Sequence, residues 1–395
     1  MVSGPGAPVT VWEPGSAPRR LLAVGGGWFP AQPGGLERYY FELAAQLTAP
    51  PWLGDWSLRG LVVGPKAAFS ESGGRVVAVP SALPLPARLA ALRREAKQLS
   101  SPLPQLWTAH FALYALPLLD LLRRRPLVVH FHGPWARESL AEGGSPLAAA
   151  AKRQLERQVY RRADRLIALS AAFADLLATE YRVPSERIRV IPGGVDLERF
   201  RDLPSRQQAR AELGWGERPT LFCLRRLSRR MGLPALLEAM AELKRWHPEV
   251  QLKLAGRGEL AGELRQLIQR LGLENQVELL GRISEADLPL ALRASDLTIL
   301  PSRSLEGFGL VAAESLAAGT PVMATPVGGL PEVLAGLPDG LLLPGASSRE
   351  IAGGLRRVFS GELELPSSRI CQEHAVRFGW QRVIQRITAV YREVL

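Results

Sequence analysis

Short apolar runs alternate with amphipathic stretches along almost the whole chain. The runs are apolar at every position rather than at every second one, which is typical of strands buried on both faces of a parallel sheet. Between them, apolar positions recur at helical spacing, as in 34–47, and predict helices. The predicted strands are 21–26, 58–64, 75–79, 126–132, 165–170 and 187–192, then 219–224, 250–256, 277–281, 297–302, 320–325 and 340–344. This alternation predicts an α/β fold.

The alternation occurs twice and lapses once, over the polar stretch 193–218, which we interpret as the connection between two domains. We therefore predict two Rossmann-like, doubly wound parallel-sheet domains, 1–200 and 201–376, that face each other across a cleft. A last amphipathic stretch follows them at 377–395. Ligands of such sheets bind beyond the carboxyl ends of the strands, so the residues that follow the predicted strands are the first candidates for a site.

Composition is compatible with two buried cores, since 47% of the 395 residues are hydrophobic. No apolar run reaches the roughly 18 residues of a membrane-spanning helix. The Pro- and Gly-rich start, 1–20, lacks the apolar centre of a secretory signal and is expected to be a frayed leader. The two cysteines, Cys223 and Cys371, lie far apart without zinc-ligand spacing, which suits a reducing compartment. We expect a cytoplasmic protein.

The net charge of +11 is concentrated in the first half of the chain, where residues 1–200 hold 24 Lys and Arg against 16 Asp and Glu. A basic surface attracts phosphates, nucleic acid or anionic lipid. A genome that favours arginine codons explains the same excess without any partner. The charge alone therefore leaves the partner open.

The most informative segment is PSRSLEGFGLVAAESLAAGTPVMATPVGG, 301–329, directly after a predicted strand. We expect Glu306 just before a helix whose first turn, 307–310, offers backbone amides to an anion or to sugar oxygens. Glu306 is suited to accept hydrogen bonds from sugar hydroxyls, and Glu314, one to two turns into the helix, from a ribose diol. The alternative is two solvated helix glutamates beside a glycine turn.

The segment EGFGLVAAE, 306–314, is similar to the paired-glutamate motif of glycosyltransferase family 4, in which the first glutamate contacts the transferred sugar and the second contacts the ribose. The resemblance implies a retaining, nucleotide-sugar-dependent glycosyltransferase of the GT-B fold, with the acceptor in the first domain and the helix of 377–395 returning to that domain. It extends in order over GGLER (34–38), RVIPGGVDLERF (189–200), LAGRGE (254–259), VELLGRIS (277–284), GGLPEV (328–333) and RFGWQRVIQRITAVYREVL (377–395).

These motifs define the candidate site. The donor-binding candidates are Gly34, Gly35, Arg226, Arg230, Gly256, Ile283, Glu306, Gly307, Phe308, Gly309, Leu310 and Glu314. The catalytic candidates are His132, Arg226, Arg230 and Glu306, and the acceptor-side candidates are His110 and His132.

An arginine cluster follows the first predicted strand of the second domain, in CLRRLSRRMGL, 223–233. The planar guanidinium group matches phosphate oxygens, so Arg225, Arg226, Arg229 and Arg230 are candidates to neutralise a diphosphate leaving group, as a metal does elsewhere. Much of the family has G-R-L, three variable residues and K-G here. Arg226 matches that arginine, Met231 stands at the lysine position, and Arg230 is the nearest substitute. The alternative is a solvated charge cluster.

A glycine-rich loop follows the first strand, and Gly34 and Gly35 at its helix start allow the backbone to approach a diphosphate closely. A dinucleotide site competes with this interpretation, but no GxGxxG opens a helix and no acidic residue follows at the expected offset. His130 and His132 alternate along one strand and point the same way, as metal ligands can, yet no further ligands accompany them. The resemblance favours His132 near the reacting sugar and His130 as structural. His110, at another strand end, fits the acceptor side or the core.

No Asp-x-Asp triplet is present to hold a diphosphate-bound cation. We expect metal-independent transfer without a cofactor, from a UDP-, GDP- or other nucleotide sugar to a sugar, small-molecule or lipid-linked acceptor, and no nucleic-acid partner. Basic stripes on the predicted helices 86–99 and 148–166 make an anionic membrane surface a further candidate partner, against an ordinary solvated helix face. The alternative functions are a sugar-nucleotide epimerase of the same fold and a basic nucleic-acid-binding protein.

Overall fold

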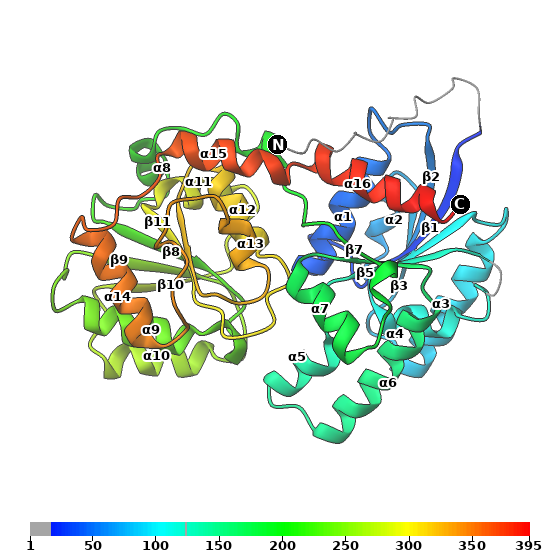
Figure 1. The fold of residues 1–395 in the computed structure, drawn as a ribbon, viewed down its shortest axis with the longest axis horizontal. Helices are drawn as coiled ribbons and strands as arrows, with labels where there is room; N and C mark the ends of the chain where they lie inside the picture. The colour runs from blue at the N-terminus through cyan, green and yellow to red at the C-terminus, as the bar shows by residue number, and fades with distance from the viewer. Residues whose placement is uncertain (1–16, 123–124) are drawn as a thin grey trace. The chain divides into compact units, whose positions relative to one another are not determined.

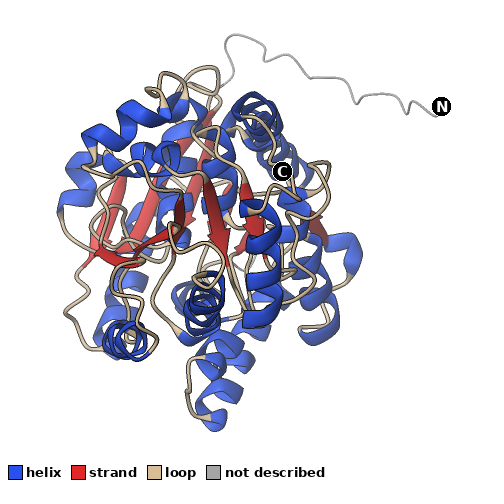
Figure 2. Cartoon of the chain, turned by 90° about the vertical axis from the view of Figure 1, so that its left-hand side faces the viewer, coloured by secondary structure: helices blue, strands red, loops and turns tan. Residues whose placement is uncertain are grey.

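The computed structural model describes residues 17–122 and 125–395, so most of the predicted leader lies outside the described residues (Figure 1). The strands form a seven-stranded sheet in the order β3-β2-β1-β4-β5-β6-β7 and a five-stranded sheet in the order β10-β9-β8-β11-β12. Every strand pair with a known register is parallel, and helices lie on both sides of the strands (Figure 2). The described residues up to Val128, with Val394 and Leu395, form one compact unit, and Val129–Glu393 form another.

The first unit contains the strands β1 to β4 in parallel register. Its elements are β1 (Arg19–Val24), α1 (Gly35–Leu47), β2 (Trp56–Val63), α2 (Ala67–Glu71), β3 (Val76–Val79), α3 (Leu85–Leu99), β4 (Leu106–Ala109), α4 (Ala112–Ala115) and η1 (Leu116–Leu118). The predicted strands of this region are confirmed. The predicted strands do not include β4, which ends directly before His110, the residue expected at a strand end.

The second unit begins within the seven-stranded sheet. Its first elements are β5 (Leu127–Phe131), α5 (Trp135–Ala141), α6 (Pro146–Arg162), β6 (Arg165–Ala168), α7 (Ala171–Glu180), η2 (Ser185–Arg187) and β7 (Ile188–Val190). The C-terminal helix α16 (Trp380–Glu393) contacts these strands, because the Tyr391 hydroxyl lies 2.8 Å from His130 Nε2 and Glu393 pairs with Arg165 and Arg189.

The five-stranded sheet follows in the same unit. Its elements are β8 (Thr220–Leu224), η4 (Arg229–Met231), α9 (Leu233–Leu243), β9 (Gln251–Ala255), α10 (Ala261–Arg270), β10 (Val277–Gly281), α11 (Asp287–Ala294), β11 (Leu297–Leu300), α12 (Leu310–Ala317), β12 (Val322–Ala324), α13 (Leu330–Leu334), α14 (Ser348–Phe359), α15 (Ser368–Ala375) and η5 (Val376–Phe378). One face is covered by α9, α10 and α14, and the other by α11, α12 and α15 (Figure 1). Covered on both faces, the strands are apolar throughout.

The polar stretch 193–218 is not a bare connection. It contains η3 (Leu197–Phe200) and α8 (Arg206–Glu212), whose start has a capping box between Ser205 and Gln208. The buried Arg210 of α8 donates to the Ala294 carbonyl at 2.9 Å and pairs with Asp296 at 2.6 Å, so α8 packs against α11. The domain boundary at residue 200 stays a prediction.

The predicted strand at 340–344 is wrong. Only an isolated bridge joins Leu342 to Ala324. Gly340 has φ +96° and Pro344 has no N–H, so turns bound the apolar run on both sides. Leu342 is 38% exposed, which a strand inside the sheet would not allow.

Both sheets place their first strand between the second and the fourth, as β2-β1-β4 and β9-β8-β11. From β1 the following strands are added first on one side, as β2 and β3, and then on the other side, beginning with β4. The same switch occurs between β8 and β11 in the second sheet. The predicted doubly wound architecture is therefore confirmed. In such sheets ligands bind beyond the carboxyl ends of the strands at the reversal point. In residues 17–122 and 125–395, no helix combines the length and apolarity required to cross a membrane.

Candidate active site

Two loops meet at the carboxyl edge of β8 and β11, and their backbones contact each other directly. The Arg303 amide donates to the Arg230 carbonyl at 2.8 Å. Gly232 has φ +71°, and a Cβ there would lie 1.8 Å from the Pro301 carbonyl oxygen. This close approach requires glycine. The loop that carries the arginines, 225–232, is thereby joined to the loop that carries Glu306.

Glu306 lies four residues before α12, as predicted, and is fixed at both ends. Its carbonyl accepts from the Gly329 amide at 3.0 Å, and a Cβ on Gly328 would lie 1.8 Å from the same oxygen. Its carboxylate accepts from the Ser302 hydroxyl and pairs with Arg225, both at 3.1 Å. The preceding Leu305 has φ +57°, a strained conformation for a non-glycine residue that is held by these contacts.

The helix α12 begins three residues later than the predicted first turn of 307–310, and the glutamates on either side of its N-terminus are shielded from solvent. Gly309, with φ +93°, occupies the N-cap position, and α12 begins at Leu310. Phe308 is buried against Phe378, with ring centroids 5.2 Å apart. Glu314 is 4% exposed and the Glu306 side chain 12% exposed, so two solvated helix glutamates do not describe this segment.

The four arginines have separate environments. Arg225 is buried beside Glu306, whereas Arg226 is exposed. Arg229 is 64% exposed and lies 3.9 Å from Glu263. Arg230 donates to the Leu305 carbonyl at 3.0 Å, next to Glu306.

Met231 is buried in the hydrophobic core of the five-stranded sheet, so its side chain is not at the loop surface. Arg230, the residue before Met231, instead contacts the loop that carries Glu306. It is the residue that the sequence analysis suggested as a substitute for the family lysine at position 231. A solvated charge cluster describes Arg229 but not Arg225 or Arg230.

Two carboxylates that the sequence analysis did not select contact the arginine loop: Glu138 of α5 and Glu142, which follows the end of α5. Glu142 accepts from the Ser228 hydroxyl at 2.8 Å and the Arg229 amide at 3.2 Å, and it lies 3.2 Å from Arg230. Glu138 lies 3.5 Å from Arg230, and burial raises its pKa although the guanidinium groups of Arg230 and Arg226 oppose the rise. An i, i+4 pair on one helix face was the available signal.

His132 directly follows β5, and its backbone lies beside Gly307. A Cβ on Gly307 would lie 3.3 Å from the His132 carbonyl oxygen and 2.9 Å from the ring of Phe173. Burial lowers the pKa of His132 to about 3, so its imidazole is neutral at physiological pH. His130 is buried and bonded to Tyr391, which agrees with a structural role. Among the described residues no group of three or more His, Cys, Asp and Glu is arranged to hold a metal ion.

Two further donor-site candidates lie at neighbouring strand ends of the five-stranded sheet. Gly256, with φ +137°, follows β9, and a Cβ there would lie 1.8 Å from the Arg225 carbonyl oxygen. Ile283 is half-buried, two residues after β10. Gly256 therefore packs against the arginine loop.

The carboxyl edge of β1 and β4, in the first unit, holds the remaining candidates. Gly35 begins α1 and is exposed, with no atom within 4 Å of a Cβ built on it, and Gly34 precedes it. His110 is buried, with its ring edge-on to Tyr40 at 5.0 Å and tilted against Tyr39 at 6.0 Å. This burial favours the core alternative for His110.

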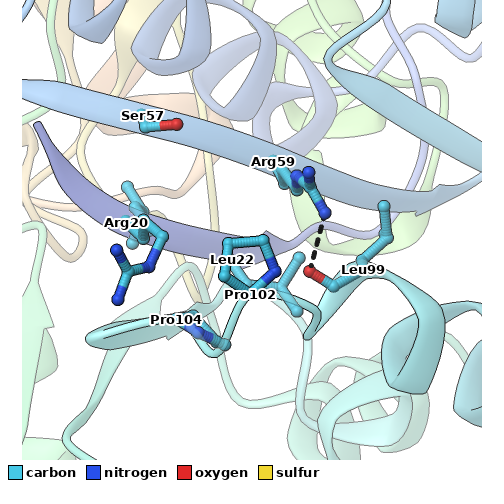
Figure 3. A pocket seen from close by; sticks show the side chains of 8 residues that line it. Arg20, Leu22, Ser57, Arg59, Leu99, Pro102 and Pro104 are labelled. Atoms are coloured by element: carbon cyan, nitrogen blue, oxygen red, sulfur yellow. Dashed lines mark hydrogen bonds between the residues drawn. The ribbon is translucent and has the colours of Figure 1, made fainter.

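Described residues of the first unit line an open groove and a smaller cavity. An open groove of about 420 Å³ follows the carboxyl ends of β1, β2 and β3, lined by Ala31, Gln32, Gly64, Pro65, Lys66, Pro80, Ser81 and Ala82. Its volume is in the range of small-molecule sites. The second, of about 50 Å³, lies by Arg20, Ser57 and Arg59 near the starts of β1 and β2 (Figure 3). It is too small for a nucleotide sugar and lies at the opposite edge of the sheet.

Comparison with known proteins identifies the family. Residues 33–199 match the model described as Glycosyltransferase Family 4, and residues 205–376 match Glycosyl transferases group 1. D-inositol 3-phosphate glycosyltransferase 1 of Catenulispora acidiphila is 34% identical over 284 residues, 68% of this chain and 67% of that protein. The chain belongs to glycosyltransferase family 4.

Other family members align over a smaller share of their length. The D-inositol 3-phosphate glycosyltransferase of Saccharomonospora viridis is 36% identical over 251 residues, 61% of this chain and 58% of that protein. Solved structures share the GT-B fold. Sucrose-phosphate synthase of Thermosynechococcus elongatus aligns with a TM-score of 0.78 at 21% identity, over 95% of this chain and 98% of that chain. Anabaena Alr3699/HepE, in complex with UDP and glucose, aligns with a TM-score of 0.75 at 24% identity, over 94% and 99%.

Proposed function

We propose that this protein is a retaining, metal-independent glycosyltransferase that moves a sugar from a nucleotide sugar to a hydroxyl acceptor. The observation that carries the proposal is the carboxyl edge of β8 and β11. There the N-terminus of α12 lies between two shielded glutamates, and Arg230 is bonded to the adjoining loop. Family membership supports the reaction class.

Charge stabilisation is the main chemical contribution expected of this site. As the glycosidic bond breaks, negative charge develops on the diphosphate. Arg226, Arg230 and the amides of 307–310 would stabilise that charge, which lowers the barrier because the charge is largest in the transition state. Gly34 and Gly35, at the carboxyl edge of β1, would offer backbone amides to an anion.

The sugar and the ribose would be held by carboxylates. Glu306 would orient the sugar hydroxyls and Glu314 would bind the ribose diol, each through charge-assisted hydrogen bonds. The acceptor hydroxyl would attack from the face that the diphosphate leaves, so that the configuration of the sugar is retained. The backbone carbonyl of His132 lies near Gly307, and the neutral imidazole of His132 would accept a hydrogen bond from the reacting sugar or donate one to it.

For the donor, UDP-glucose is the first candidate, because the Anabaena protein of the same fold binds UDP and glucose. For the acceptor, the names of the relatives suggest a phosphorylated cyclitol such as inositol 3-phosphate. The groove beside Lys66 offers space for such an acceptor in the first unit. Lipid-linked acceptors are the second choice.

Association with an anionic membrane remains a secondary proposal. On α3, Arg93 pairs with Asp120 and Arg88 donates to the Ser81 and Leu83 carbonyls, so these two cations are partly used by the fold. Lys97 on α3 is exposed, as is Arg161 on α6. Co-sedimentation with anionic and neutral liposomes at low and near-molar salt tests the proposal, since electrostatic docking disappears at high salt.

A thermal-shift panel of UDP, GDP, ADP and dTDP sugars is the first test of the reaction class. A ligand present at about 100 times its Kd adds roughly 2.7 kcal/mol of stability to the native state. The stabilising donor is then incubated with and without inositol 3-phosphate. Nucleoside diphosphate released only with acceptor supports a transferase. A sugar configuration that changes without acceptor would instead identify an epimerase. The other alternative, a nucleic-acid-binding protein, predicts a gel shift at physiological salt.

A further inference from the structure

Arg225 differs from the other three arginines of its loop in burial. It follows β8 directly and is 7% exposed. Its amide donates to the Ala255 carbonyl at 3.0 Å, and its own carbonyl lies against Gly256, where a Cβ would be 1.8 Å away. The backbone of Arg225 is therefore fixed between the ends of β8 and β9, which defines the position of its Cα and Cβ atoms.

The guanidinium group of Arg225 is paired with one carboxylate. Its Nη1 lies 3.1 Å from Oε2 of Glu306, whose side chain is 12% exposed. Its Nε and Nη2 are buried without a hydrogen-bond partner in the described part of the chain. Unfilled buried donors weaken a fold, and a buried ion pair adds little net stability. Stability therefore does not explain an arginine at this position.

The ion pair with Glu306 also distinguishes Arg225 from Arg226 and Arg230. The exposed Arg226 forms no ion pair among the described contacts, and Arg230 pairs with Glu138 and Glu142 rather than with Glu306. The Ser302 hydroxyl donates to the same Oε2 that Arg225 contacts. Both contacts fall on one oxygen of Glu306, which leaves Oε1 for the hydroxyls of a sugar.

We infer that Arg225 is a positioning residue, which fixes the direction of the free oxygen of Glu306 toward the transferred sugar. This inference rests on the proposed function. It assigns Arg225 to the sugar, through Glu306, and not to the diphosphate. Removal of Arg225 should therefore slow transfer while leaving the affinity for a nucleoside diphosphate unchanged.

A double-mutant cycle tests this assignment. Arg225→Met, Glu306→Gln and the double variant are compared with wild type for kcat, KM and the Kd of the nucleoside diphosphate (UDP, GDP, ADP or dTDP) that the panel selects. Arg225→Met should lower kcat about 100-fold and leave that Kd within about 2-fold. In the Glu306→Gln background, Arg225→Met should lower kcat by less than about 3-fold, because both residues contribute to one interaction.

Two variants make the result specific. Arg225→Lys keeps the charge without the fork of donors, so it should recover part of kcat. Arg226→Met is the matched control and should weaken nucleoside diphosphate binding at least about 10-fold. If Arg225→Met unfolds the protein, the double variant serves in its place, because it removes both buried charges and melting curves report its fold.

Additive losses in the cycle, or weakened nucleoside diphosphate binding in Arg225→Met as in Arg226→Met, would overturn the inference while the proposed function stands. A wild-type protein that binds none of the four nucleoside diphosphates and turns over none of the donors overturns the proposed function and, with it, the inference.

Discussion

The loop after β1 and the loop after β8 occupy the same place in two sheets with the same strand order, yet their chemistry is opposite. Residues 25–35 include five glycines and no charged residue, whereas residues 225–232 include four arginines. The first loop opens onto Gly35, which has free space around it, and the second is tied through Gly232 to the loop that carries Glu306. The strand order thus determines where in each sheet a ligand is expected to bind. The residues of the loop determine the chemistry of that ligand.

Replacement of the two arginines that we propose to bind phosphate, Arg226 and Arg230, should have the largest effect. Arg226→Ala and Arg230→Ala should each slow transfer by about 100- to 1,000-fold, because each removes charge stabilisation from the breaking bond. The double variant should lose less than the product of the two, since both act on one diphosphate. Steady-state kinetics measures all three. The exposed Arg229→Ala is the control, and a severe loss there with a silent Arg230→Ala would mean that Arg229 replaces the lysine.

Glycine substitutions test whether the two loops also differ in rigidity. Gly232→Ala should cost about 2–4 kcal/mol of unfolding free energy, because the left-handed backbone and the Pro301 carbonyl both oppose a Cβ. Gly35→Ala should cost less than about 1 kcal/mol, because nothing lies within 4 Å of the added methyl group. Urea unfolding curves measure both values. Equal costs would show that the charged loop is not held more tightly than the glycine loop.

Chelation should have the smallest effect. If arginines rather than a metal ion meet the developing charge, transfer in EDTA should stay within about 2-fold of the untreated rate. The same assay with added magnesium or manganese should give no further gain. A loss in EDTA that either ion restores would transfer the electrophilic role from the charged loop to a metal site.

Much of this arrangement follows from local sequence. Apolar runs locate the strands because both sheet faces are covered, and the glycines after Glu306 indicate that it precedes α12. The prediction of a strand at 340–344 was wrong because apolar character alone does not distinguish a strand from a short segment between turns.

The partners of the site side chains do not follow from local sequence. Arg225 contacts Glu306, 81 positions away, and Ser228 contacts Glu142, 86 positions away. Such pairs depend on which strand ends the fold brings together. The four arginines therefore resemble one phosphate site in the sequence. In the structure Arg225 is buried against Glu306 and Arg229 faces outward, which leaves Arg226 and Arg230 as the two candidates for phosphate.

The central claim is that the edge of β8 and β11 binds a nucleotide through α12. Calorimetric titration of wild type and Glu314→Ala with UDP, GDP, ADP and dTDP tests it most directly. We predict that at least one nucleoside diphosphate binds wild type. Its binding should weaken by about 1.5–3 kcal/mol in Glu314→Ala, because the ribose loses charge-assisted hydrogen bonds. Melting curves should show that the variant remains folded. Equal affinity in the two proteins, or no binding of any of the four to wild type, would contradict the claim.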